Sequence, residues 1–386
     1  MRKKLFAFSS TLFFLFSIPL MPANATAKTG GICTKQGKIA KASGNTFTCI
    51  KIGKKLVWSK GVTVTKPAPE KIPAMPTTFT DLEAKHEGIP YAVWEKIQSN
   101  LALHKSTNLK ITFLFGPTTP QRYPNQWTID AVTLGSRVMA AQKQPAEVKF
   151  VQFNKSDVLW ARTEAEKYIS PFRLGISFPD QASEKCAGVD CDGAVTNIAS
   201  DIGLVLVGVA NPVNRFNIQK FNGQNDLHEY THAVQGMIFK GKTQSPPPVL
   251  MPCWFSEGQP QAVSIPTVAR SAEEYVKIRK GWITDNRWVL KDYEPETIQD
   301  FLRKNMKLPC DENSYSMVFH LGYIVMDTLV AIGGIDKTFD VLTSIADGMS
   351  YEDSFKNTYG ISWDEASVLL SKAVSKIYKH YKIEIT

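Results

Sequence analysis

Residues 228–232 read His228-Glu229-Tyr230-Thr231-His232. Residues four apart on a helix share a face, so the imidazoles of His228 and His232 would lie side by side, close enough to bind one Zn²⁺. Glu229 could then hold the water that the metal activates. This spacing is typical of zinc hydrolases, with two imidazole ligands and a glutamate general base. The alternative is an amphipathic helix with two surface histidines, although the chain has only six histidines in 386 residues.

The first 25 residues have the features of a secretory signal peptide. Basic residues at positions 2–4 precede an apolar run from Leu5 to Met21, and small residues follow at Ala23 and Ala25. This pattern predicts cleavage near Ala25 and a protein that is secreted or associated with the cell envelope. The alternative is an uncleaved membrane anchor. No later stretch is predicted to be long and apolar enough to span a membrane.

The six cysteines of an exported chain indicate disulfide bonds rather than metal ligands. Six cysteines allow many pairings, so the sequence leaves the connectivity open. Pairing of sequence neighbours is the simplest hypothesis. It joins Cys33 to Cys49, Cys186 to Cys191, and Cys253 to Cys310.

Residues 28–65 are predicted to form a small basic β module. Between Lys28 and Lys66 there are many lysines and no Asp or Glu, whereas the rest of the chain is nearly balanced and the formal net charge is +9. Thr46–Ile50 alternates like a strand, and Leu56–Trp58 follows a turn. A disulfide would hold together a module that is too small to be stabilised by burial alone.

Two hypotheses fit the charge of this module. The functional one is attachment to an anionic cell-envelope surface through residues 28–65. The alternative is a solvated accessory module without a ligand. No nucleic-acid-binding motif accompanies the lysines, so nucleic acid is not an expected partner.

A proline-rich linker over residues 66–79 is expected to separate the module from a catalytic domain over residues 80–386. The first part of this domain mixes strands and helices. Strands are predicted over residues 109–115, 147–153 and 202–210, and helices over residues 125–142 and 156–169, the second capped by Ser156.

The second part of the domain, from Trp254 onward, has helical spacing almost throughout. Helices are predicted over residues 271–283, 296–305, 314–332, 336–346 and 363–380. A mixed sheet in the first half and helices in the second predict an α+β fold, preceded by the small β module. The zinc site would lie in the cleft between the two halves.

Glu257 is the candidate third ligand, because a catalytic zinc usually has three protein ligands and one position for water. It lies 25 residues after His232, in the sequence Trp254-Phe255-Ser256-Glu257-Gly258, where a second helix can begin and pack beside the first. Without the histidines, Glu257 would be interpreted as a solvated carboxylate. With them, the combination resembles the gluzincins, the thermolysin-like zinc peptidases, and especially their peptidase-MA-like branch. The resemblance covers about residues 195–380.

The resemblance implies a zinc-dependent peptidase acting on peptides or proteins, with His228, His232 and Glu257 as ligands and Glu229 as base. Two positions depart from the gluzincin pattern. Gln261 stands where an Asp often orients a ligand histidine. A glutamine can accept one hydrogen bond from an imidazole but brings no charge, so support for the histidine is expected to be weaker or to come from another residue. Pro260 stands where an Ala is usual, and we expect it in a first helical turn, where proline is tolerated.

Such a reaction needs a hydrogen-bond donor for the oxyanion that develops opposite the metal. Tyr315, His320 and Tyr323 lie on one predicted helix and are the candidates. Since a Tyr or His has this role in gluzincins, we favour Tyr315. The alternative for all three is packed core.

Two other functions compete with the peptidase. The first is a catalytically impaired exported protein of the same fold that binds zinc or the cell envelope; the intact Glu229 argues against it. The second is a zinc hydrolase acting on another carbonyl, such as an amide of cell-wall material. Three further histidines, His86, His104 and His380, lie outside any ligand spacing and are interpreted as structural or solvated.

Overall fold

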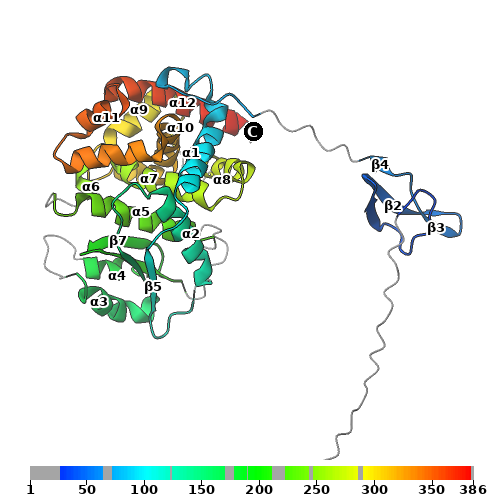
Figure 1. Cartoon of the computed structure of the whole chain (residues 1–386), viewed down its shortest axis with the longest axis horizontal. Helices are drawn as coiled ribbons and strands as arrows, with labels where there is room; N and C mark the ends of the chain where they lie inside the picture. Colours follow the sequence, from blue (N-terminus) through cyan, green and yellow to red (C-terminus); the bar gives the residue numbers. More distant parts are fainter. Residues whose placement is uncertain are drawn as a thin grey trace, which may run out of the picture. The chain divides into compact units, whose positions relative to one another are not determined.

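The computed structural model describes residues 27–63, 72–121, 124–169, 178–188, 190–210, 222–242, 247–285 and 290–383. The chain divides into two compact units, residues 1–71 and 72–386 (Figure 1). The boundary between them falls inside the predicted linker, residues 66–79. The predicted signal peptide, residues 1–25, lies outside the described residues.

Unit 1 is an antiparallel sheet of four short strands, as predicted for a small β module. The strands are β1 (Ile39–Ala42), β2 (Asn45–Ile52), β3 (Lys55–Trp58) and β4 (Val62–Thr63). Its core consists of Phe47 and Trp58 around the disulfide between Cys33 and Cys49. So few buried side chains cannot stabilise a domain by burial alone, and the disulfide compensates by restricting the unfolded chain.

Unit 2 contains a second four-stranded sheet with the strand order β5-β6-β8-β7. Strands β5 (Lys110–Phe115), β6 (Glu147–Phe153) and β8 (Ile202–Gly208) are parallel, and β7 (Ala194–Ala199) is antiparallel to β8 at the edge. The three parallel strands match the predicted segments within two residues. The edge strand β7 was not predicted.

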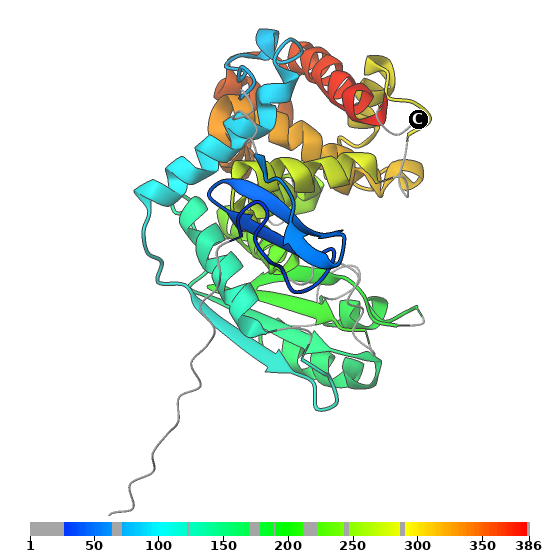
Figure 2. The same ribbon diagram turned by 90° about the vertical axis from the view of Figure 1, so that its right-hand side faces the viewer.

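Helices cover both faces of this sheet. Val148, Phe150, Val205 and Val207 pack on the face covered by α2 (Asn125–Val138) and α5 (Gln224–Phe239). The alternate residues of the same strands, Val151, Phe153, Leu204 and Leu206, pack on the face covered by α3 (Val158–Glu166) and α4 (Gln181–Glu184). The period of two in a strand thus gives a three-layer arrangement, visible from the side in Figure 2.

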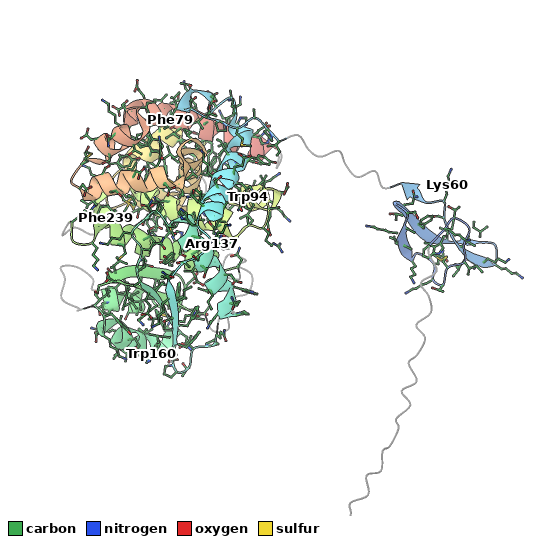
Figure 3. All side chains as sticks on the ribbon, viewed as in Figure 1. Lys60, Phe79, Trp94, Arg137, Trp160 and Phe239 are labelled. Carbon is green, nitrogen blue, oxygen red and sulfur yellow. A yellow bond between two sulfur atoms is a disulfide. The ribbon has the colours of Figure 1, made fainter. Side chains whose placement is uncertain are left out.

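The remainder of unit 2 is helical, so the α+β fold with a helical C-terminal half is confirmed. Figure 3 labels Trp160 at the sheet end of the unit and Phe79 at the helical end. The other helices are α1 (Ile89–Leu103), α6 (Pro247–Leu250), α7 (Cys253–Val268), α8 (Ala272–Thr284), α9 (Pro295–Lys304), α10 (Met317–Ala346), α11 (Tyr351–Tyr359) and α12 (Trp363–Ile383). Short 3₁₀ turns occupy Phe79–Asp81, His86–Gly88, Lys155–Asp157, Phe178–Asp180 and Glu312–Ser314.

Two glycines let the backbones of α7 and α10 touch. A Cβ atom at Gly258 would lie 2.4 Å from the carbonyl oxygen of Gly322, and one at Gly322 would lie 2.7 Å from the carbonyl oxygen of Trp254. Any larger residue at either position would separate the helices. This contact fixes α7 at the residue next to Glu257.

Helix α10 contains the two helices predicted over residues 314–332 and 336–346. They are separated by a kink at Gly334, whose φ of 78° is not helical. The length and composition of α10 are sufficient to cross a membrane, contrary to the expectation that no stretch after residue 25 would be. However, 78% of its most apolar stretch is buried inside unit 2, where it is a central core helix.

The predicted cap at Ser156 is wrong. Asn154 provides it instead, because its side-chain oxygen accepts hydrogen bonds from the backbone N–H groups of Ser156 and Asp157. A 3₁₀ turn over Lys155–Asp157 then leads into α3 at Val158. Asn154 thus caps the 3₁₀ turn, whereas a cap at Ser156 would have accepted from N–H groups further along the chain.

Candidate metal centre

Helix α5 carries both histidines of the motif and lies between the sheet and the helical half. It begins after Gly223 and ends at Phe239. Asp226, in its first turn, is buried and accepts a hydrogen bond of 2.5 Å from the hydroxyl of Thr128 on α2. The four-residue spacing places the Nε2 atoms of His228 and His232 3.1 Å apart.

Glu257 reaches the two histidines from the first turns of α7. Its Oε2 atom lies 3.3 Å from Nε2 of His228 and 3.3 Å from Nε2 of His232. Ligand atoms bound about 2.0–2.1 Å from a tetrahedral zinc ion are about 3.4 Å apart. The three side chains therefore form a group that could hold a metal ion with little movement.

The charges of these side chains also favour a cation. Burial alone would lower the pKa of His232, but the Glu257 carboxylate outweighs it and raises this pKa to about 9. Burial would raise the pKa of Glu257, yet the two imidazoles hold it far below its usual range. At neutral pH His232 therefore carries a proton beside the Glu257 carboxylate, and a metal ion could take the place of that proton.

A chain of buried amides fixes the orientation of His232. Nε2 of Gln235 donates to the Ser256 carbonyl at 3.2 Å and to Oε1 of Gln259 at 2.8 Å. Oε1 of Gln235 is therefore the acceptor for Nδ1 of His232, 2.8 Å away. With its proton on Nδ1, neutral His232 presents a lone pair on Nε2 toward the proposed metal position.

The chain continues to α10, where Nε2 of Gln259 donates to the hydroxyl of Thr338 at 2.7 Å. We call Gln235, Gln259 and Thr338 the amide relay. All three are buried, so their hydrogen bonds are costly to break. By contrast, Nδ1 of His228 is buried without a partner among the described residues.

Two expectations about α7 are corrected. Gln261 does not orient a histidine; its Oε1 atom accepts from Gln224 at 3.3 Å, and Gln235 contacts His232 instead. Pro260 lies inside α7, which begins at Cys253, and not in its first turn. Because proline has no N–H, the Ser256 carbonyl lacks its usual helical donor and accepts the Gln235 side chain instead.

The proposed base is held by the edge strand that the sequence did not predict. The hydroxyl of Thr196 on β7 donates to Oε2 of Glu229 at 2.7 Å and lies 3.2 Å from its backbone oxygen. Glu229 is half-buried on α5, next to His228. Its carboxylate is thus anchored beside the group of ligands.

The three candidate oxyanion donors lie in different surroundings. Tyr323 is fully buried, and its hydroxyl donates to that of Tyr275 at 3.3 Å. His320 packs on Trp282, with Nδ1 3.3 Å from the carbonyl oxygen of Trp282. Both belong to the packed core.

Tyr315, just before α10, is the candidate on the side of the metal group. It is 50% exposed, and its ring packs edge-on against Phe319, which also contacts the ring of His228. Partial burial and the charge of Glu257 raise the pKa of Tyr315. Its hydroxyl therefore stays protonated at neutral pH.

The three cysteine pairs predicted from neighbouring positions all lie at disulfide distance, and all six cysteines are paired. The bond between Cys253 and Cys310 joins the start of α7 to the segment before Tyr315. It therefore links the chain segments that carry Glu257 and the candidate donor. Such pairs are typical of proteins that fold in an oxidising compartment.

A second group that could hold a metal consists of His86, Glu87 and His380. Its donor atoms lie within 4.8 Å of one another, and Glu87 and His380 are exposed. We call it the outer group. His86 and His380 are separated by almost the whole of unit 2 in sequence, so their meeting could not be inferred from spacing.

Gln235, by contrast, could have been predicted from the sequence as a partner of His232, since it lies three residues after His232 on the same helix face.

Comparisons of the chain with protein-family models, curated proteins and solved structures each found no match.

Proposed function

We propose that this protein is an exported zinc-dependent peptidase that hydrolyses peptide bonds in peptide or protein substrates. One observation carries the proposal. The donor atoms of His228, His232 and Glu257 lie 3.1–3.3 Å apart, and Glu229 is anchored beside them. The sequence of residues 1–25 and the three cysteine pairs support a secreted or envelope-associated location.

Each residue has a distinct role in this proposal. A bound Zn²⁺ supplies a Lewis acid and lowers the pKa of its water ligand toward about 7. The Glu229 carboxylate accepts the proton of the attacking water and passes it to the leaving amine, while Thr196 orients it. The protonated hydroxyl of Tyr315 donates a hydrogen bond to the developing oxyanion.

The decisive test compares metal content with turnover. We expect the purified wild type to contain about one zinc per chain and to cleave members of a peptide library. Glu229→Gln should keep the zinc and lose at least about a thousandfold in kcat/KM. His232→Ala is the matched control, in which both zinc and activity should be lost.

The remaining outcomes separate the alternatives. A Glu229→Gln variant as active as the wild type would refute the assigned mechanism. Stoichiometric zinc with no cleavage of any peptide by the wild type would identify a catalytically impaired zinc-binding protein. Release of amines from cell-wall material, but not from peptides, would identify a hydrolase of another amide.

A further inference from the structure

The sheet of unit 1 has one face that packs on its core and one face that does not. Phe47 and Cys49 of β2 point inward, together with Trp58, which pairs with Cys49. Since side chains alternate along a strand, Ile50 and Ile52 point to the opposite face. We call this opposite face the outer face.

The strand register gathers further aliphatic side chains on the outer face. Ile50 pairs with Val57, and Val57 in turn bridges to Ile32, so these three form one row across the sheet. Ile39 pairs with Thr48 in the neighbouring row. Thus four isoleucines from three segments of the chain share one surface.

These isoleucines are strongly exposed. The exposed fractions are 83% for Ile32, 63% for Ile39, 60% for Ile52 and 38% for Ile50. Single exposed aliphatic side chains are ordinary on protein surfaces, but a contiguous group indicates an interaction site. The outer face therefore requires a partner with an apolar component.

The same unit is purely cationic. Residues 28–65 contain lysines but no acidic residue, and every lysine among the described residues of unit 1 is exposed. The register places Lys41 on the outer face opposite Thr46, and Lys55 there opposite Ile52. Lys60, labelled in Figure 3, follows β3. The apolar centre is thus bordered by positive charge.

The combination of isoleucine and lysine selects among anionic partners. A soluble polyanion would explain the lysines but not the exposed isoleucines. A sugar polymer would be expected to stack on exposed aromatic rings, yet Phe47 and Trp58, the aromatic residues of this segment, are buried. A bilayer containing anionic phospholipid offers acyl chains to the isoleucines and negative headgroups to the lysines.

We propose that the outer face of unit 1 binds the surface of membranes that contain anionic phospholipids. Apolar side chains enter the headgroup boundary, and lysines pair with phosphates. Neither contribution alone anchors a protein firmly, so the attachment is reversible. The proposal does not depend on the peptidase assignment.

The test uses the full exported chain, without residues 1–25, and sedimentation with vesicles. Vesicles of phosphatidylcholine and phosphatidylglycerol should bind the protein, and vesicles of phosphatidylcholine alone should bind it much less. High salt should weaken the binding but leave a residual part, because the apolar contribution is not screened. Absence of binding to the anionic vesicles at low salt would overturn the proposal.

Substitutions distinguish the two contributions. Replacing Ile39, Ile50 and Ile52 together by threonine keeps β-branched side chains in the strands and should weaken vesicle binding about tenfold or more. Lys41→Gln with Lys55→Gln should weaken binding and reduce its salt dependence. Leu159→Gln removes a comparably exposed aliphatic side chain from α3 of unit 2 and should change nothing.

Two results would contradict the proposal even if the protein binds vesicles. If the threonine variant binds as tightly as the wild type, the outer face is not the contact surface. If soluble polyglutamate competes completely with the vesicles, an anionic polymer is the better partner. A mapped bond between Cys33 and Cys49 would confirm that unit 1 is folded in each variant.

Discussion

The described part of the chain contains two groups with the same donor chemistry, two histidines and one glutamate, in very different surroundings. In the group of His228, His232 and Glu257 the donor atoms lie 3.1–3.3 Å apart and are mostly buried. In the outer group they lie within 4.8 Å, and Nδ1 of His380 is 3.7 Å from Oε1 of Glu87.

The difference between the groups lies in the residues behind the ligands. His232 is fixed by the amide relay, which spans α5, α7 and α10. In the outer group, Nδ1 of His86 contacts the backbone oxygen of Glu83. Burial, together with the nearby charges of His380 and Lys376, lowers the pKa of His86 below its usual value. Residue identity therefore does not define a metal site; fixed geometry does. We expect metal at the first group and not at the outer one.

The largest expected effect comes from removing a ligand. Glu257→Ala should lower zinc affinity about a thousandfold or more, because a fixed donor and its charge are lost. Glu87→Ala in the outer group is the matched control and should leave stoichiometry and affinity unchanged. Zinc competition with a chromogenic chelator measures both. A loss of one zinc in the Glu87→Ala variant would show that the two groups are equivalent.

The next effect tests the amide relay. Gln235→Leu keeps the side-chain length but leaves Nδ1 of His232 without its acceptor, so we expect zinc affinity to fall about ten- to a hundredfold. Gln261→Leu removes a buried amide of α7 that does not contact His232, and its zinc affinity should stay near wild type. Equal affinity in both variants would mean that fixed geometry does not explain the difference between the groups.

A smaller effect is expected for the support of the base. Thr196→Val removes the hydrogen bond to Oε2 of Glu229 at nearly constant volume. We expect kcat to fall about tenfold while zinc content stays unchanged. Steady-state kinetics with a peptide found in the library digest provides the measurement. A fall in zinc content instead would assign Thr196 to the integrity of the site rather than to Glu229.

The smallest expected effect comes from a comparison of two carboxylates outside the group of His228, His232 and Glu257. Glu147 is held by hydrogen bonds, whereas Glu87 is exposed. Burial raises the pKa of Glu147, but hydrogen bonds from Lys149 and Thr112 outweigh it and lower the pKa from 4.5 to about 2. Because the folded-state pKa is lowered, this stabilisation is present above about pH 4.5 and is lost as the pH falls through about 2.

We therefore expect Glu147→Gln to reduce the free energy of unfolding by about 1 kcal/mol at neutral pH. The difference from wild type should shrink as the pH falls from 4.5 toward 2 in denaturant titrations. The free energy of unfolding of the Glu87→Gln variant should equal that of the wild type throughout this pH range. A constant difference for Glu147→Gln across this range would contradict a role for its charge.

The fold was predictable where periodicity is strong. The strand over residues 147–153 was predicted with its observed bounds, because apolar and charged residues alternate clearly there. Strand β7 was missed because Thr196 and Asn197 interrupt its apolar character, and it forms a strand only by pairing with β8. Such tertiary pairing leaves little local signal.

The candidate site was predictable only as far as local spacing extends. The meeting of His228 and His232 follows from the helical repeat, and Glu257 was proposed from its separation along the chain, with a resemblance in support. The roles of Thr196 and Gln259 depend on how distant segments pack, and the contact of Gln235 with His232 was not predicted. Sequence spacing specifies neighbours on one element but not partners across elements.

Formation of the bond between Cys253 and Cys310 depends on the redox state of the compartment in which the chain folds. In the cytosol both thiols would remain reduced, and the turn of α7 that carries Glu257 would not be tied to the segment before Tyr315. The disulfide would therefore add its cross-link between these two segments only after the chain has left the reducing compartment.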